Sequence, residues 1–335
     1  MENNGNVILV AYLIMLREKN NTKKYLDLSQ FGDANEDLYQ IMKGYLESQR
    51  PQNGSNPKIF KEGNKKTIYF NSVQYNDQER TIKTRVDIGE FGTSYPIMDV
   101  NTGVTKYTTS KDDTTSTPIN IFISIPKASN EKDLRRTHGI AVFEKFRNRA
   151  AKGLFQENFN KYFKPSHDNF IVEFEPYTPS YLLDYLKEDL KNNNSLTKVE
   201  LKSMQIPSDL TDVFEGTNEH GRGPTISLEL SGKGFTPSFR SKIGGILRHE
   251  SSIRGILGDW FPTDQIAFNI EVEGERKRIV IKEDGETILP GIDITHLVSE
   301  DPLTGFPDQA SIFKESEKHV KQIYEMMNKM EGLSP

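Results

Sequence analysis

The stretch HGIAVFEKFRNRAAKGLFQENFNKYF, residues 138–163, decides how the chain is interpreted, because its hydrophobic period changes in the middle. The first part is rich in β-branched and aromatic residues and predicts a strand; the second repeats apolar residues at helical spacing. Residues 132–152 around this corner contain seven Lys or Arg against two acidic residues, whereas the whole chain carries a formal charge of −5. A basic corner in an acidic protein predicts an anion-binding surface. An ordinary solvated face is the alternative interpretation.

The composition limits the class of protein. A chain of 335 residues suggests two domains, and the 35% of hydrophobic residues suffices for a core. The absence of cysteine excludes disulfides, thiolate zinc sites and thiol nucleophiles, and it fits a reducing compartment. The most apolar run, VILVAYLIML at residues 7–16, is too short to span a bilayer and lacks the basic flank of a signal peptide. We therefore expect a buried strand there, no direct membrane insertion and a cytoplasmic location.

Along the chain, β-type runs outnumber helical ones and the two alternate irregularly. This pattern predicts an α+β fold with mixed or antiparallel sheets, interspersed helices and an amphipathic C-terminal helix over residues 309–330. A short strand at residues 25–28, a helix over 33–49 and a polar connector at 111–118 are also expected. The linker-like run EGTNEHGRGP, residues 215–224, predicts a boundary. The expected domains are residues 1–215, with the basic corner, and a smaller α+β domain, residues 216–335, with a hairpin and the final helix.

A second basic stretch, residues 222–254, is glycine-rich around SGKGFTPSFRSKIGG, which is typical of backbone sites for anions but is no Walker loop. Apolar residues over 243–257 keep helical spacing. The two stretches together predict binding to nucleic acid, most simply double-stranded DNA, largely independent of sequence and sensitive to salt. The expected phosphate-contacting residues are Arg147, Arg149, Lys152, Lys242, Arg248 and Arg254.

Two other functions stay open. Glu200 and Lys202 form a Glu-x-Lys pattern on an expected strand, which with an upstream acidic residue such as Asp184 or Asp189 is the minimal pattern of metal-dependent nucleases. Glu and Lys also alternate on the wet face of ordinary strands. The six histidines show no metal-ligand spacing, so neither a metal nor a cofactor is predicted outside that alternative. The third possibility is a non-enzymatic module for protein interaction or assembly, docking through the Met-rich face of the C-terminal helix.

The order of these pieces resembles that of the cytoplasmic DNA-binding component of the Rex phage-exclusion system. The resemblance rests on TKKYLDLSQF, INIFISI, HGIAVFEKF, VEFEPY, KVELKSMQIP, PTISLEL and HVKQIYEMM, in that order. It covers most of the chain, but the family has no diagnostic motif and this chain is longer, mainly over residues 53–118.

The resemblance implies a bacterial or prophage-encoded antiviral protein that binds DNA as a self-associating subunit, such as a homodimer. It also implies a separate membrane-protein partner. No catalytic residue is implied, because the family is not known for any. The sequence therefore predicts first a nucleic-acid-binding sensor or exclusion subunit of an anti-phage defence system.

Overall fold

The computed structural model describes residues 6–20, 24–50, 59–61, 65–128, 133–147, 149–177, 196–203, 226–231, 235–247, 252–253, 256–258, 261, 263, 265–272, 275–282 and 288–330. The chain forms two compact units, one of Met1–Glu175 with Ile294–Pro335 and one of Pro176–Asp293. This division differs from the two consecutive domains expected from the sequence, because the C-terminal helix packs on strands of the N-terminal part. The expected boundary at residues 215–216 lies outside the described residues.

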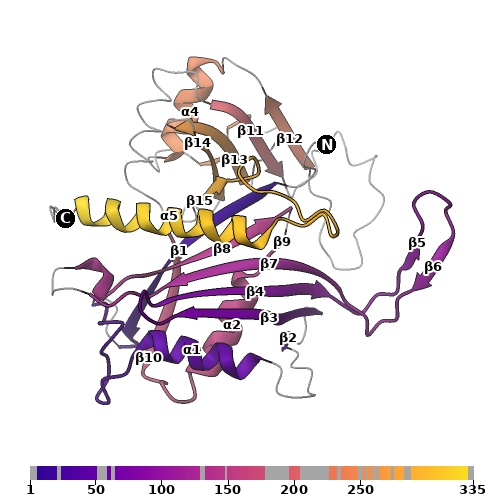
Figure 1. The fold of residues 1–335 in the computed structure, drawn as a ribbon. Helices are drawn as coiled ribbons and strands as arrows, with labels where there is room; N and C mark the ends of the chain where they lie inside the picture. The colour runs from indigo at the N-terminus through magenta and orange to yellow at the C-terminus, as the bar shows by residue number, and fades with distance from the viewer. Residues whose placement is uncertain are drawn as a thin grey trace. The chain divides into compact units, whose positions relative to one another are not determined.

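The first unit is built on an antiparallel sheet with the strand order β2-β3-β4-β7-β8-β1, to which β10 adds on β1 and β9 on β8 (Figure 1). The strands are β1 (Val7–Glu18), β2 (Ile59–Lys61), β3 (Lys66–Asn76), β4 (Thr81–Glu90), β7 (Thr115–Ser124), β8 (Gly139–Phe146), β9 (Arg149–Ala150) and β10 (Phe170–Pro176). The helices are α1 (Leu38–Gln49), η1 (Leu134–Arg136), α2 (Lys152–Phe163) and α5 (Gln309–Met330). The α+β class and the C-terminal helix expected from the sequence are confirmed.

Helices cover both faces of this sheet, because successive side chains of a strand point to opposite sides. On one face the ring of Phe143 packs against Phe155 of α2, and Tyr45 of α1 contacts Phe70 and Phe155. On the other face Phe146 contacts Phe306, just before α5, with ring centroids 5.8 Å apart. The core of the first unit therefore has two layers, one on each side of the sheet.

A two-stranded hairpin leaves the sheet between β4 and β7. It consists of β5 (Pro96–Met98) and β6 (Thr105–Thr108), which form a separate two-stranded sheet. Figure 1 shows this hairpin projecting beyond the ends of β4 and β7. We call residues 94–109 the arm.

The second unit holds an antiparallel sheet with the order β12-β11-β13-β14-β15. Its strands are β11 (Leu196–Ser203), β12 (Ile226–Ser231), β13 (Gln265–Val272), β14 (Glu275–Lys282) and β15 (Ile288–Asp293), and its helix is α4 (Pro237–Leu247). The hairpin expected within residues 216–335 is confirmed as β13 and β14.

Four local expectations need correction. Residues 25–28 form only an isolated bridge, between Tyr25 and Arg17. Helix α1 begins at Leu38, since Asp37 caps it by accepting a hydrogen bond from the Tyr39 N–H. The end of the polar connector belongs to β7, which starts at Thr115 because its backbone pairs with β4. Helix α4 ends at Leu247, so the helical spacing over 243–257 does not mark one continuous helix.

Candidate functional site

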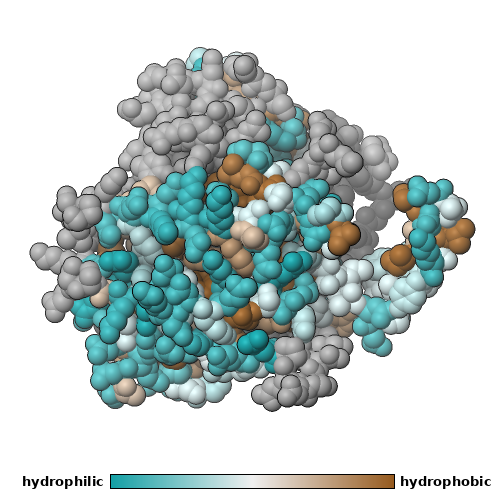
Figure 2. All heavy atoms as spheres, in the orientation of Figure 1, coloured by the Kyte–Doolittle hydropathy of each residue, from teal (hydrophilic) through white to brown (hydrophobic). Residues whose placement is uncertain are grey.

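The arm carries most of the large apolar side chains exposed on the described part of the molecule. Six of the nine such residues lie on it, and each is 43–95% exposed. They are Tyr95, Ile97, Met98, Val100, Val104 and Tyr107. Figure 2 shows apolar, brown side chains gathered on the arm. Single exposed apolar residues are ordinary, but a contiguous group is typical of an interaction surface.

The arm's turn is ordered by its own sequence. The Asp99 carboxylate accepts hydrogen bonds from the N–H groups of Asn101 and Thr102 at 2.9 and 3.0 Å. The Asp99 N–H donates to the Val104 carbonyl at 2.8 Å, and Gly103 takes a φ of +68°, which glycine adopts without strain. Lys106 Nζ lies 2.6 Å from Asp99 Oδ2. This ion pair, followed by the backbone hydrogen bonds, lowers the pKa of Asp99.

Hydrogen bonds also fix the base of the arm. The Tyr95 N–H donates to Thr109 Oγ1 at 2.7 Å, and the Thr109 N–H returns to the Tyr95 carbonyl at 2.9 Å. The Tyr107 hydroxyl donates to the Asp113 carboxylate, a bond that raises the pKa of the phenol. Ile97 and Tyr107 lie directly opposite each other across the hairpin. The apolar surface is therefore preorganised, which reduces the entropy lost when a partner binds.

The basic corner predicted from the sequence lies where β8 passes through β9 into α2. Arg147 is exposed, at a φ of +54°, and its N–H donates to the Asn6 carbonyl at 3.1 Å. Arg149 and Lys152 are half-buried. Lys152 Nζ lies 5.1 Å from the centroid of the Tyr12 ring, and burial lowers the pKa of this amine. None of these three cations forms an ion pair with another described residue.

Of the other predicted phosphate contacts, one belongs to the second unit and two lie outside the described residues. Lys242 belongs to α4 of the second unit, where its Nζ donates to the Ile256 carbonyl at 3.0 Å. Arg248 and Arg254 lie outside the described residues. Of the six predicted phosphate contacts, the structure describes Arg147, Arg149 and Lys152 in the first unit.

Glu200 and Lys202 lie on the same side of β11, because they are two residues apart on a strand. Lys202 Nζ is 3.2 Å from Glu200 Oε1, and the neighbouring Lys198 pairs with Glu229 of β12 at 2.8 Å. Glu229 lies directly opposite Glu200. Asp184 and Asp189 are outside the described residues, and among those described no three His, Asp or Glu side chains converge to hold a metal ion. The arrangement is a ladder of ion pairs, and the nuclease alternative stays a prediction.

A buried polar cluster on the α5 side of the sheet was not foreseen from the sequence. Glu144 of β8 is 1% exposed, and its Oε2 accepts hydrogen bonds from the N–H and the amide of Asn120 at 2.8 and 2.7 Å. Arg85 of β4 lies opposite Asn120. Burial raises the pKa of Glu144 to about 7, while the hydrogen bonds and Arg85 act against this shift. Because it is enclosed, this carboxyl group bears on the stability of the first unit.

The arm was not predicted from the sequence. A signal was present: apolar residues flank the turn sequence DVNTG without the polar alternation of a half-buried strand. Whether such residues face a core depends on what packs over them, and this information is not local.

Comparison of the chain with protein-family models, curated proteins and solved structures finds no match. The resemblance to the Rex component thus remains a prediction. Of the helices that the structure describes, none combines the length and the apolar composition needed to cross a bilayer.

Proposed function

We propose that this protein is an assembly subunit that associates with a second copy of itself through the arm. The observation that carries the proposal is the group of six exposed apolar side chains on a hairpin whose turn and base are held by hydrogen bonds. Of the functions predicted from the sequence, this is the interaction or assembly module. The docking surface differs from the expected one, since several apolar residues of α5, including Ile312, Val320 and Ile323, are buried.

A second copy fits the chemistry of the arm better than a charged partner does. Asp99 and Lys106 neutralise each other, so the arm presents little net charge to its copy although the chain carries −5. No other described strand pairs with the two-stranded sheet β5-β6, and two identical edges pair antiparallel about a two-fold axis.

The experiment is light scattering and sedimentation equilibrium on the full chain and on the double variant Met98→Glu/Val100→Glu. These side chains are 55% and 95% exposed, so their replacement leaves the fold intact. We expect the wild type to dimerise and the variant to dissociate at least about tenfold more readily, because two charges would be buried in an apolar interface.

The matched control is Leu303→Glu, which adds a charge at a side chain 94% exposed but outside the arm. It should dimerise as the wild type does. A wild type that stays monomeric at about 100 μM, or a Met98→Glu/Val100→Glu variant that dimerises normally, would overturn the proposal. If the wild type is monomeric, the partner of the arm is a different protein and not a second copy of this chain.

The second candidate function is nucleic-acid binding at the basic corner, favoured by Arg147, Arg149 and Lys152, which form no ion pair with another described residue. Because each phosphate contact releases counterions, Arg147→Ala/Arg149→Ala should reduce the slope of log affinity against log salt for duplex DNA by about 2. Lys161→Ala/Lys164→Ala removes the same charge from the other end of α2 and serves as control. Equal salt slopes in the two double variants would show that the basic corner does not contact DNA phosphates. Phage defence and a membrane-protein partner rest on the resemblance alone.

A further inference from the structure

A pocket of about 400 Å³ opens in the first unit beside the C-terminal half of α5. Its walls come from four segments: α5, the turn between β3 and β4, the end of β7 with the residues after it, and η1. This volume is within the range of small-molecule sites. None of its lining residues belongs to the arm or to the candidate cation site of Arg147, Arg149 and Lys152, so the pocket serves neither proposed function.

The inner wall of the pocket is apolar. Phe122 of β7 and Val320 of α5 are 1% and 4% exposed, so they present only their edges to the pocket. Tyr324 completes this wall, and its hydroxyl donates to the Ser124 carbonyl at 3.3 Å. Burial raises the pKa of Tyr324, so the phenol stays neutral. This wall suits a flat or aliphatic body.

The rim carries two exposed lysines and two carboxylates, one of which is neutralised by an ion pair. Lys127 and Lys321 are both exposed, and neither forms an ion pair with a described residue. Of the two lining carboxylates, Glu317 pairs with Lys83 at 3.3 Å and Glu79 accepts a hydrogen bond from the Asn76 amide at 3.2 Å. Two cations at the rim therefore remain available to an anion.

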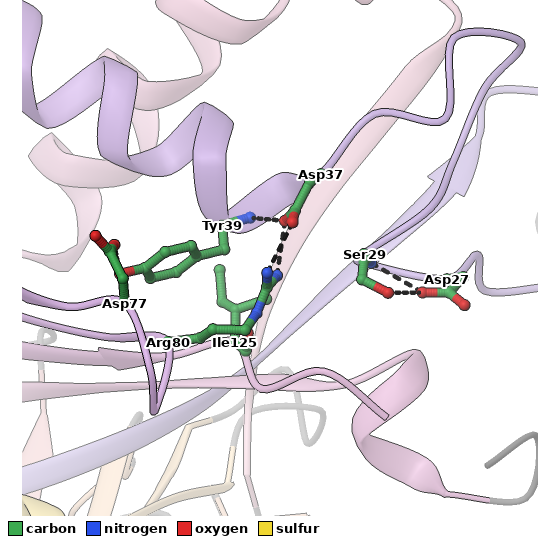
Figure 3. A network of polar contacts seen from close by, with 7 residues as sticks. All are labelled: Asp27, Ser29, Asp37, Tyr39, Asp77, Arg80 and Ile125. Atoms are coloured by element: carbon green, nitrogen blue, oxygen red, sulfur yellow. Dashed lines mark hydrogen bonds and ion pairs between the residues drawn. The ribbon is translucent and has the colours of Figure 1, made fainter. Parts of the chain in front are cut away.

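The two arginines of the pocket differ in what they can still bind. Arg80 is fully engaged: its guanidinium donates to both oxygens of Asp37 at 2.7 Å and to the Ile125 carbonyl at 2.7 Å (Figure 3). It ties the β3–β4 turn to α1, and its role is structural. Arg135 is held by Asp133 through Nε and Nη2, at 2.9 and 2.6 Å, which leaves Nη1 without a described partner. Arg135 thus offers an oriented donor beside the two lysines.

We propose that this pocket binds a small organic anion, with its phosphate or carboxylate group on Lys127, Lys321 and Arg135 and its apolar body against Phe122, Val320 and Tyr324. Charge-assisted hydrogen bonds from several cations fix the head group. The apolar wall distinguishes such a ligand from an inorganic ion. A nucleotide-like or acyl-type metabolite has this chemistry, and the two sources differ in the head group.

The test is isothermal titration of the full chain with phenyl phosphate, benzoate and inorganic phosphate. We expect phenyl phosphate or benzoate to bind, the tighter of the two identifying the head group, and inorganic phosphate to bind at least about tenfold more weakly. Lys127→Ala/Lys321→Ala should weaken binding at least about tenfold. The matched control Lys318→Ala removes a lysine of α5 outside the pocket and should bind as the wild type does.

The proposal is overturned if neither aromatic probe binds at about 5 mM, or if inorganic phosphate binds as tightly as phenyl phosphate. Equal affinities for wild type and Lys127→Ala/Lys321→Ala would also overturn it. Thermal unfolding of each variant, followed by circular dichroism, checks that the fold is kept. None of these pocket variants changes the arm. Their dimerisation can therefore be measured independently of whether the pocket binds a ligand.

Discussion

The first unit contains the same turn twice, in two different surroundings. Asp-Val-Asn-Thr-Gly at 99–103 and Asp-Pro-Leu-Thr-Gly at 301–305 form the same hydrogen bonds: the Asp carboxylate accepts from the second and third following N–H groups. In both turns the glycine has a φ of +68° and donates its N–H to the Asp carbonyl. The next residue differs in its surroundings, since Phe306 packs on Phe146 whereas Val104 is 62% exposed. A turn is specified locally, but its role is set by what lies beside it.

Carboxylates of the packed region and of the arm also differ. Burial raises the pKa of Glu144, while Lys106 and backbone N–H groups lower that of Asp99. Burial in the packed region thus favours the protonated form of Glu144, whereas the contacts of the arm favour the ionised form of Asp99. This contrast between the packed region and the arm yields four predictions.

The largest effect is expected for Glu144. Its pKa rises from 4.5 to about 7 on folding, so the unfolded chain loses its proton first as the pH increases. The stability associated with the protonated group is present below pH 4.5 and is lost as the pH rises to about 7. The loss is on the order of 3 kcal/mol. In urea unfolding, Glu144→Gln should remove the fall in the free energy of unfolding between these two pH values. An unchanged fall would mean that other groups cause it.

Phe306→Ala should lower the free energy of unfolding of the first unit by about 2 kcal/mol, since the lost ring contacts the buried Phe146. Val104→Ala should change it by less than about 0.5 kcal/mol, because its side chain is 62% exposed. Urea titrations of both variants give the comparison. Similar losses in the two would mean that the arm is packed in solution.

Gly103→Ala and Gly305→Ala should each lower the free energy of unfolding by about 1 kcal/mol, because alanine is strained at a φ of +68°. No clash adds to this loss, since nothing lies within 4 Å of either added Cβ. Amide hydrogen exchange would show which part of the first unit each substitution destabilises. The Gly305 variant should lower protection across the sheet under α5, whereas the Gly103 variant should lower it in the arm alone. Loss of sheet protection in the Gly103 variant would show that the arm folds together with the sheet.

The smallest effect is expected from acidification of the arm. With its pKa lowered, Asp99 keeps its turn hydrogen bonds at ordinary pH and loses them as the pH falls through a value below 3.8. A titration of the Asp99 carboxyl carbon by NMR, with the amide shifts of Asn101 and Thr102, measures this midpoint. A midpoint at or above 3.8 would mean that the Lys106 pair does not form in solution.

Much of the fold follows from patterns within single segments. The period change at residues 138–163 became β8 and α2, and the apolar repeat over 309–330 became α5 with the expected bounds. The DVNTG turn was also readable, since its Asp and Gly act on their immediate neighbours. The basic corner was found by charge alone: Arg147 follows β8, Arg149 lies on β9 and Lys152 begins α2.

Only the tertiary structure decided which apolar residues are covered and which cations are paired. Val104 and Phe306 follow the same turn, yet one is exposed and the other packs on the sheet. Lys321 and Arg135 meet at one pocket although they are far apart in the chain. Local sequence sets backbone conformation through φ preferences and hydrogen bonds to near neighbours. Burial and charge pairing depend on segments brought together from distant parts of the chain.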